Sequence, residues 1–130
     1  MRSGEFDSVQ VCYNLSRQAA GRHLLDEARE ANMGVNTMRP MTSGILQRQL
    51  EYLAPEWLEN DRAFEVCLSF LLSDSRVHTI PVGMRWSHEV RKNADFVEDF
   101  EPKCDIALLP RMTGTVYETD DARWGDHRAL

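Results

Sequence analysis

Three short β-type runs alternate with three stretches of helical periodicity over residues 1–100, and this order limits the folds open to the chain. The β-type runs are 9–15, 35–39 and 77–82, and they are rich in Val, Thr, Ile and Tyr. Apolar residues recur at helical spacing within 17–32, 61–72 and 87–100. Strands separated by helical crossovers form a parallel sheet with right-handed connections. The order predicts an α/β fold, either a doubly wound sheet or a piece of a (β/α) barrel.

The helical stretches differ in how clearly they are marked. The apolar positions expected on one face of the first helix are Ala20, Leu24, Leu25, Ala28 and Ala31. Gly34 is expected just past its end, and Ser16 can cap its start. Residues 46–60 predict a looser, partly helical connection.

The later helices are expected to open at Asp61 and near Ser87. The stripe predicted for the helix after Asp61 is Ala63, Val66, Cys67, Phe70 and Leu71. Val90, Ala94 and Val97 are expected on one face of the last helix, and the chain reads as irregular after Pro102.

The bulk properties exclude several classes of protein. A formal net charge of −6 disfavours general nucleic-acid binding, which needs a basic face. The sequence has no apolar run near the roughly 18 residues of a membrane span, and its start lacks the apolar core of a signal peptide. Cys12, Cys67 and Cys104 are odd in number and far apart, which favours reduced packing cysteines in a cytoplasmic protein.

Polar residues follow the predicted strands at the edge where parallel α/β folds bind ligands. This group comprises Gln10, Tyr13, Asn14, Met38, Arg39, Ser43, Gly44, Gly83, Arg85 and Ser87. Gly83 would let backbone approach a ligand, and the following helix would offer free N–H groups and the positive end of its dipole. Arg85 adds a planar cation suited to phosphate. A phosphate-bearing ligand is one interpretation, and a plain turn with a solvated Arg85 is the other.

The sequence offers little for catalysis. His23, His78, His88 and His127 are not placed beside a candidate nucleophile, and His78 fits a hydrogen-bonded histidine at the opposite strand end. The acidic clusters at 95–101 and 118–121 read as solvated faces, so no metal site is expected.

Three stretches together resemble the aldo-keto reductase family over roughly residues 4 to 100. "EFDSVQVCYNL" resembles its sixth barrel strand, and "GVNTMRPMTSGIL" resembles the seventh strand with the following loop. "AFEVCLSFLLSDSRVHTIPVGMRWSHEVRKN" resembles the seventh helix, the eighth strand and the start of the eighth helix. The most specific features are "LSD", a strand ending in "PVG", and Asn93 ten residues after Gly83.

The resemblance implies the C-terminal half of a (β/α)8 barrel over residues 1–100, with an irregular tail over 101–130. It also implies carbonyl reduction with a nicotinamide cofactor, usually NADP, without metal. Gln10 occupies the position that hydrogen-bonds the nicotinamide carboxamide. Met38 stands where an aromatic residue commonly stacks on the nicotinamide ring, and Arg39, Met41 and Ser43 line the pyrophosphate stretch.

By the same resemblance, residues 83–93 would contact the adenosine end of the cofactor. Gly83, Met84 and Arg85 match the segment that meets the adenosine phosphate, and Asn93 matches the adenine-contacting asparagine. Glu89 sits where Arg or Gln is usual, and a carboxylate there would repel a 2′-phosphate. Arg85 favours NADP and Glu89 opposes it, so NAD stays open.

The family's catalytic Asp, Tyr, Lys and His lie on the first half of the barrel, and none has a counterpart here. One hypothesis is therefore a fragment of an oxidoreductase that is inactive alone. The other is a non-catalytic half-barrel that binds a nucleotide weakly, or assembles with another chain through open sheet edges. A barrel segment predicts three parallel strands in sequence order, with helices on the outer face only. It also predicts inward apolar residues that are unusually exposed, with Val11, Tyr13 and Ile80 as candidates.

Overall fold

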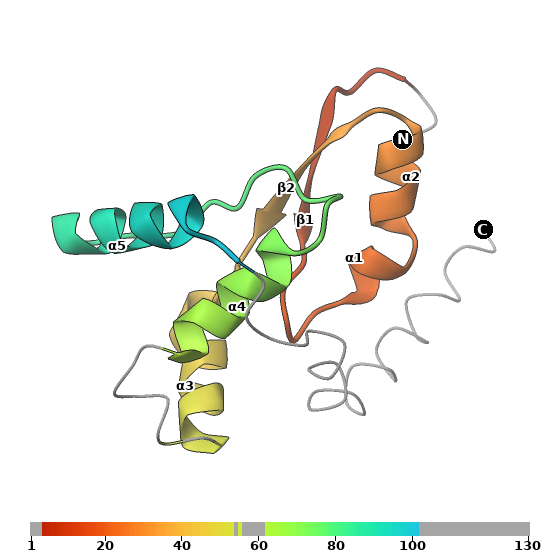
Figure 1. Ribbon diagram of the computed structural model, residues 1–130. Coiled ribbons are helices and arrows are strands. Elements are labelled where there is room, and N and C mark those ends of the chain that lie inside the picture. The colour runs from red at the N-terminus through yellow and green to blue at the C-terminus, as the bar shows by residue number, and fades with distance from the viewer. Residues whose placement is uncertain (1–3, 54, 56–61, 102–130) are drawn as a thin grey trace.

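The computed structural model describes residues 4–53, 55 and 62–101, which form two strands, five α-helices and one 3-10 turn. In order, these are β1 (Ser8–Cys12), α1 (Ala19–Arg22), α2 (Leu24–Glu30), β2 (Gly34–Met38), η1 (Thr42–Gly44), α3 (Ile45–Leu53), α4 (Arg62–Leu72) and α5 (Ser87–Glu98). Asp61 and almost all of the expected 101–130 tail lie outside the described residues. In Figure 1, α5 extends to the opposite side of the strands from α1 and α2.

The two strands are parallel and in register, from Ser8 opposite Gly34 to Cys12 opposite Met38. Their order along the sheet is the one expected. The predicted third strand at 77–82 is wrong in its extent, because only one parallel bridge joins this segment to β2, between Asn36 and Thr79.

Two local features explain why the third strand is so short. The Val35 amide donates to His78 Nδ1 at 3.0 Å, so a histidine ring takes a position that a strand carbonyl would otherwise occupy. The Thr37 amide donates to the Thr79 carbonyl at 2.9 Å, but Pro81, two residues later, has no N–H to continue the ladder. The segment therefore pairs with β2 through one bridge and the hydrogen bonds around it, and the expected role of His78 as a hydrogen-bonded histidine is confirmed.

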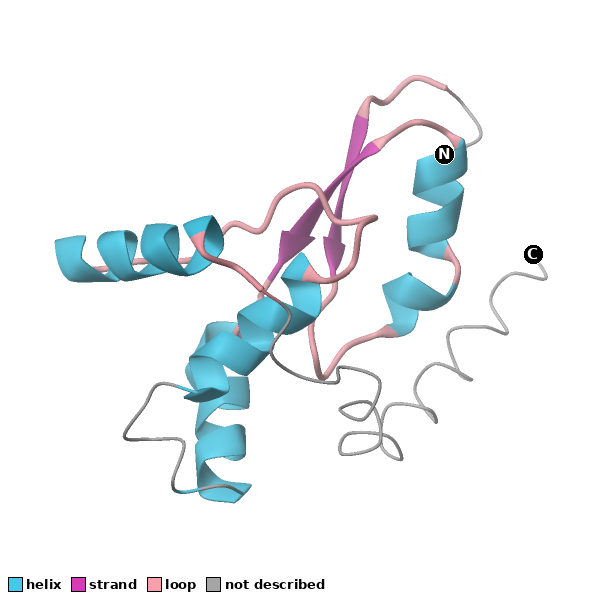
Figure 2. Cartoon of the chain, viewed as in Figure 1, coloured by secondary structure: helices cyan, strands magenta, loops and turns pink. Residues whose placement is uncertain are grey.

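The sheet buries one face only. Val11, Tyr13, Val35 and Thr37 are each at most 7% exposed, while Met38 is 39% exposed. Exposure thus alternates along the two strands, drawn as magenta arrows in Figure 2, as expected when one face of a sheet is covered. The expectation that Val11 and Tyr13 would be exposed is wrong, because both side chains point toward the helix-covered face.

The core lies between that face and helices α2, α3 and α4. The predicted α4 stripe is confirmed, and α4 buries seven residues in all: Ala63, Val66, Cys67, Leu68, Ser69, Phe70 and Leu71. Leu25 and Ala28 contribute from α2, and Leu46 and Leu50 from α3. Residues 45–53 thus form a regular helix with a buried side, which is more order than the loose connection expected there. No helix of the described chain is long and apolar enough to cross a membrane.

The first predicted helix is divided in two at His23, where φ is −143° and ψ is −49°. Gly34 is not its terminal glycine, because Asn32 adopts the left-handed conformation there, with φ of 53°. Asparagine tolerates this region better than most residues. Gly34 instead begins β2, where its amide donates to the Asp7 carbonyl at 2.8 Å.

The predicted apolar face of α5 is present but does not pack against the core. Val90 and Val97 are 50% and 51% exposed, and Ala94 is exposed as well. Phe96 faces α4 instead, with its ring centroid 6.4 Å from that of Phe64. An aromatic ring buries more apolar area than a valine, so this contact explains why the Phe96 side of α5 faces α4.

Candidate functional site

A pocket of about 500 Å³ opens beside the carboxyl ends of β2 and of the segment that follows α4. It is lined by the loop after β2, the starts of α3 and α4, residues 81–84, and one face of α5. The lining residues are Arg39, Pro40, Met41, Ser43, Gly44, Gln47, Phe64, Pro81, Val82, Gly83, Met84, Glu89, Lys92 and Asn93.

The pocket brings together seven of the ten residues that the sequence marked for a cofactor. These seven are Arg39, Met41, Ser43, Gly83, Met84, Glu89 and Asn93. The other three, Gln10, Met38 and Arg85, are not among its lining residues. Gln10 and Met38 project from the less covered face of the sheet, and Arg85 is exposed just before α5.

The loop between β2 and α3 has an unusual backbone. Arg39, Thr42 and Ser43 have φ values of 57°, 49° and 57°, and Gly44 has a φ of 81°. Only glycine adopts this left-handed region freely, and a β-branched residue such as Thr42 is an outlier there. Such strain persists only where surrounding contacts hold it, and it is commonest at ligand sites. The strained loop forms one wall of the pocket.

At the start of α5, a carboxylate of the first turn engages the two backbone amides that precede the helix. Glu89 Oε2 accepts hydrogen bonds from the backbone amides of Arg85 and Trp86, at 2.6 and 2.8 Å. The hydrogen bonds from Trp86 and Arg85 hold the pKa of the Glu89 carboxyl below its ordinary value. The carboxylate therefore places negative charge at the helix N-terminus, where the helix dipole favours an anion.

Gly83 shows no need for glycine in its own surroundings. No atom of the described chain lies within 4 Å of a Cβ placed there, and its φ is not in the left-handed region. Gly83 lines the pocket, so the open space beside it belongs to the candidate site.

The pocket carries charges and an aromatic ring that the sequence reasoning missed. Lys92 Nζ lies 5.1 Å from the centroid of the Phe64 ring, a cation–π distance. Lys92 and Arg39 supply positive charge to the lining and Glu89 supplies negative charge. The position of Lys92, three residues after Glu89 on one helix, was the available signal, since residues at that spacing share a face.

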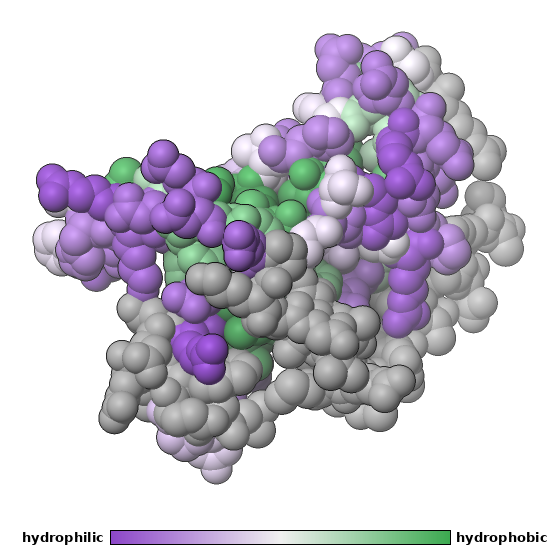
Figure 3. Space-filling model, viewed as in Figure 1, coloured by the Kyte–Doolittle hydropathy of each residue, from purple (hydrophilic) through white to green (hydrophobic). Residues whose placement is uncertain are grey.

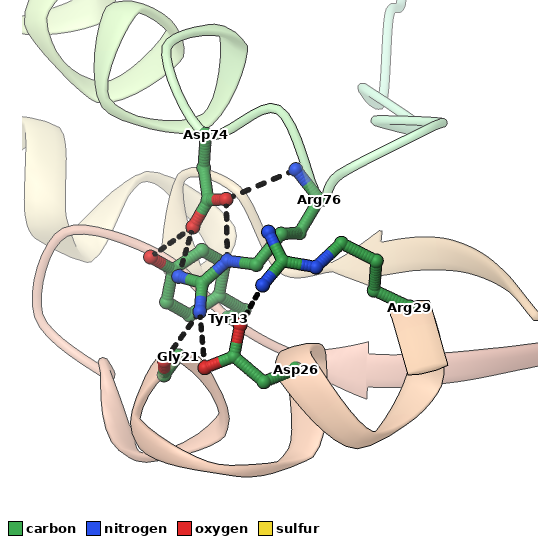
Figure 4. Close-up of polar contacts among 6 residues, drawn as sticks. All are labelled: Tyr13, Gly21, Asp26, Arg29, Asp74 and Arg76. Carbon is green, nitrogen blue, oxygen red and sulfur yellow. Dashed lines mark hydrogen bonds and ion pairs between the residues drawn. The ribbon is translucent and has the colours of Figure 1, made fainter. Parts of the chain in front are cut away.

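A second polar cluster, around Asp74 and Arg76, lies outside the pocket lining (Figure 4). The Tyr13 hydroxyl donates to Asp74 Oδ2 at 2.9 Å, and the Arg76 guanidinium donates to both oxygens of Asp74 and to the Gly21 carbonyl. Burial and the nearby Asp74 carboxylate raise the pKa of Tyr13 well above its ordinary value. Tyr13 is therefore a poor general acid. Across the described residues, no group of His, Cys, Asp and Glu is arranged to hold a metal ion.

The comparisons with known proteins identify the fold. No family model matches the sequence, and no curated protein matches it. The structure is similar to a crystal structure of the thermostable aldo-keto reductase Tm1743 in complex with the inhibitor epalrestat, with a TM-score of 0.58 and 22% identity. The match covers 77% of this chain and 37% of that reductase. The chain therefore has the fold of a partial aldo-keto reductase TIM barrel and spans little over a third of the length of that protein.

Proposed function

We propose that the pocket binds a nicotinamide dinucleotide, NADP(H) or NAD(H), and that the chain is the cofactor-binding part of an aldo-keto reductase type oxidoreductase. One observation carries the proposal. Residues from three separate stretches, 39–43, 83–84 and 89–93, meet in one pocket at the carboxyl ends of the strands. That edge is where barrels of this kind place their ligand sites.

The chemistry of the lining suits a ligand with both anionic and aromatic parts. Arg39 and Lys92 can pair with phosphate oxygens, and Ser43 and Gln47 can donate hydrogen bonds to them. Phe64 offers an apolar surface beside Asn93, whose amide can both donate to and accept from a base. A volume of about 500 Å³ falls within the usual range of small-molecule sites.

Reduction of a carbonyl would also need an acidic side chain, and we propose that none of the pocket residues supplies it. The bound dinucleotide would supply the hydride, and an acid must then protonate the carbonyl oxygen. Tyr13 does not fit that task, because its hydroxyl is engaged by Asp74 on the helix-covered side of the sheet. We therefore expect the chain alone to bind the cofactor weakly and to reduce no carbonyl.

Fluorescence titration of the purified chain with NADPH and with NADH tests the binding. Arg39→Met should raise the Kd for NADPH about tenfold, as expected for loss of one charge-assisted contact. Arg48→Met makes the same change at an exposed arginine of α3 that does not line the pocket, and it should leave the Kd unchanged. Saturation by neither cofactor up to millimolar concentration would refute the proposal.

Turnover is tested by following the nicotinamide absorbance with a panel of aldehydes. We expect no consumption of NADPH above the rate without protein. Activity that survives repurification and disappears in Tyr13→Phe would mean that this chain holds an active site of its own.

A second candidate function is a module that completes its fold by association with another chain. Large apolar side chains are exposed at Met38, Met84, Trp86, Val90 and Val97. Figure 3 shows hydrophobic surface gathered between α5 and the α1–α2 side. Apolar surface of this kind often marks an interface.

A further inference from the structure

We propose that Asn14 is a positioning residue, whose side-chain amide holds the strained 39–44 loop in the shape that forms the pocket wall. The inference rests on the proposed function for the identity of the ligand, but its structural part can be tested without any ligand.

Asn14 joins two loops through the two ends of one amide. Asn14 lies two residues after the end of β1 at Cys12, and its exposure is 0%. Its Oδ1 accepts hydrogen bonds from the Ser16 amide, the Ser16 hydroxyl and the Arg17 amide, at 3.0, 2.9 and 2.9 Å. Its Nδ2 donates to the Arg39 carbonyl at 2.8 Å and to Thr42 Oγ1 at 3.3 Å.

The hydrogen-bond partners of Asn14 require an acceptor at one end of its side chain and a donor at the other, which asparagine supplies. The amides of Ser16 and Arg17 can only donate, so an oxygen must face them. The Arg39 carbonyl can only accept, so a nitrogen must face it. An aspartate would keep the first set of bonds and place a second oxygen against the Arg39 carbonyl.

The bonds from Nδ2 reach the strained part of the loop. Arg39 and Thr42 are two of its three non-glycine residues with positive φ. The Arg39 carbonyl also accepts from the Thr42 amide at 3.0 Å, and the Gly44 amide donates to the Met41 carbonyl at 2.9 Å. Asn14 therefore ties down a turn that its own residues do not favour.

The loop in turn carries pocket residues. Arg39, Met41, Ser43 and Gly44 line the pocket, whereas Asn14 does not. Asn14 therefore reaches the pocket through its bonds to the loop, which is the sense in which it positions the site.

Amide hydrogen exchange of the full chain without ligand is the first test. Asn14→Asp should accelerate exchange of the Thr42 and Gly44 amides about tenfold relative to the wild type, in line with loss of one buried hydrogen bond. Ser16→Ala removes a bond to the other end of the same amide and should leave these two rates unchanged. Equal rates in wild type and Asn14→Asp would overturn the inference, as would equal acceleration in both variants.

Affinity for NADPH is the second test. Asn14→Asp should raise the Kd about tenfold and Ser16→Ala should not, with all measurements well below each melting temperature. Thr42→Ser keeps the hydroxyl that accepts from Nδ2 and should retain the wild-type Kd. Thr42→Val removes that hydroxyl at nearly the same size and should raise the Kd several-fold.

The outcomes separate the two proposals. A wild type that binds no dinucleotide, with loop exchange still accelerated in Asn14→Asp, would refute the proposed function and support the positioning role. Normal affinity in both Asn14→Asp and Thr42→Val would overturn the positioning role and leave the proposed function standing. If Asn14→Asp fails to fold, the two Thr42 variants test the positioning role instead. Thr42→Val should accelerate amide exchange at Gly44 and raise the Kd for NADPH, and Thr42→Ser should do neither.

Discussion

The Tyr13 hydroxyl donates a hydrogen bond to Asp74 at 2.9 Å, although the two residues are 61 positions apart. Tyr13 follows β1 and Asp74 follows α4, so the bond joins the first strand to the loop that leads into the third segment of the sheet. Arg76 reinforces the junction with a 2.7 Å ion pair to Asp74 and a 3.1 Å ion pair to Asp26 of α2. The fold is therefore closed by a polar junction as well as by its core.

Gly21→Ala should destabilise the chain by about 1–3 kcal/mol, the usual cost of forcing extra atoms into a packed site. A Cβ at Gly21 would lie 2.9 Å from Tyr13 Cε2 and 3.0 Å from its hydroxyl oxygen. Gly83→Ala is the matched control, since no described atom lies within 4 Å of its Cβ position. Urea denaturation of the three proteins measures the difference. Equal losses in both variants would show that the Tyr13 contact is not the cause.

The junction should make stability depend on pH below about pH 4. Burial alone would raise the pKa of Asp74, but hydrogen bonds from Arg76 and Tyr13 outweigh it and lower that pKa. The stabilisation is then present above the unfolded-state value of about 3.9 and is lost as pH falls through the lower folded value.

Asp74→Asn should therefore be less stable than the wild type by about 2 kcal/mol at pH 6, and the gap should close in acid. Unfolding free energies measured from pH 6 down to pH 2.5 give the comparison. Asp95→Asn, on the exposed side of α5, should match the wild type at pH 6. A gap that stays constant down to pH 2.5 would contradict the assignment.

Glu89→Gln should shift cofactor preference toward NADPH. The Glu89 carboxylate accepts from the amides of Arg85 and Trp86, and it places negative charge where a 2′-phosphate is expected by resemblance. Removing that charge should raise the ratio of NADPH to NADH affinity about twofold to fivefold at low salt. Glu98→Gln, at the other end of α5, should leave the ratio unchanged, and paired titrations provide the test. An unchanged ratio in Glu89→Gln would place the 2′-phosphate elsewhere.

The exposed apolar face of α5 should promote self-association. Val90 and Val97 are seven residues apart, so they lie on the same face of α5, and each is about half exposed. The double variant Val90→Gln/Val97→Gln should lower the apparent mass in sedimentation and reduce binding of a hydrophobic dye. Ala19→Gln changes an exposed position of α1 and should do neither. A wild type that is already a monodisperse monomer without dye binding would contradict this expectation.

The parts of the fold that the sequence predicted are those set by strong local periodicity. In α4, apolar residues repeat every three to four positions and all five predicted positions are buried. In α5 the apolar residues are few. The side of α5 that packs is therefore set by the contact of Phe96 with Phe64, which is distant in sequence. The β-type run at 77–82 was visible, but the sequence pattern does not show that a histidine ring would replace a strand carbonyl opposite Val35.

The candidate site divides in the same way. The resemblance located 39–43, 83–84 and 89–93 because those stretches are continuous in sequence. Phe64 joins the pocket from another element, which no local pattern indicates. Arg85 was expected to meet the adenosine phosphate, but it does not line the pocket, and its backbone amide donates to Glu89. The left-handed conformations of Arg39 and Thr42 could not be predicted from the sequence either, since neither residue type favours them.

The strained loop also has a kinetic consequence. A wall already fixed by Asn14 has little conformational freedom left to lose when a ligand arrives, so binding need not wait for the loop to order. Association with a preorganised wall should appear as a single phase whose rate rises linearly with ligand concentration. In such a pocket, differences in affinity among ligands would arise mainly from how slowly each one leaves.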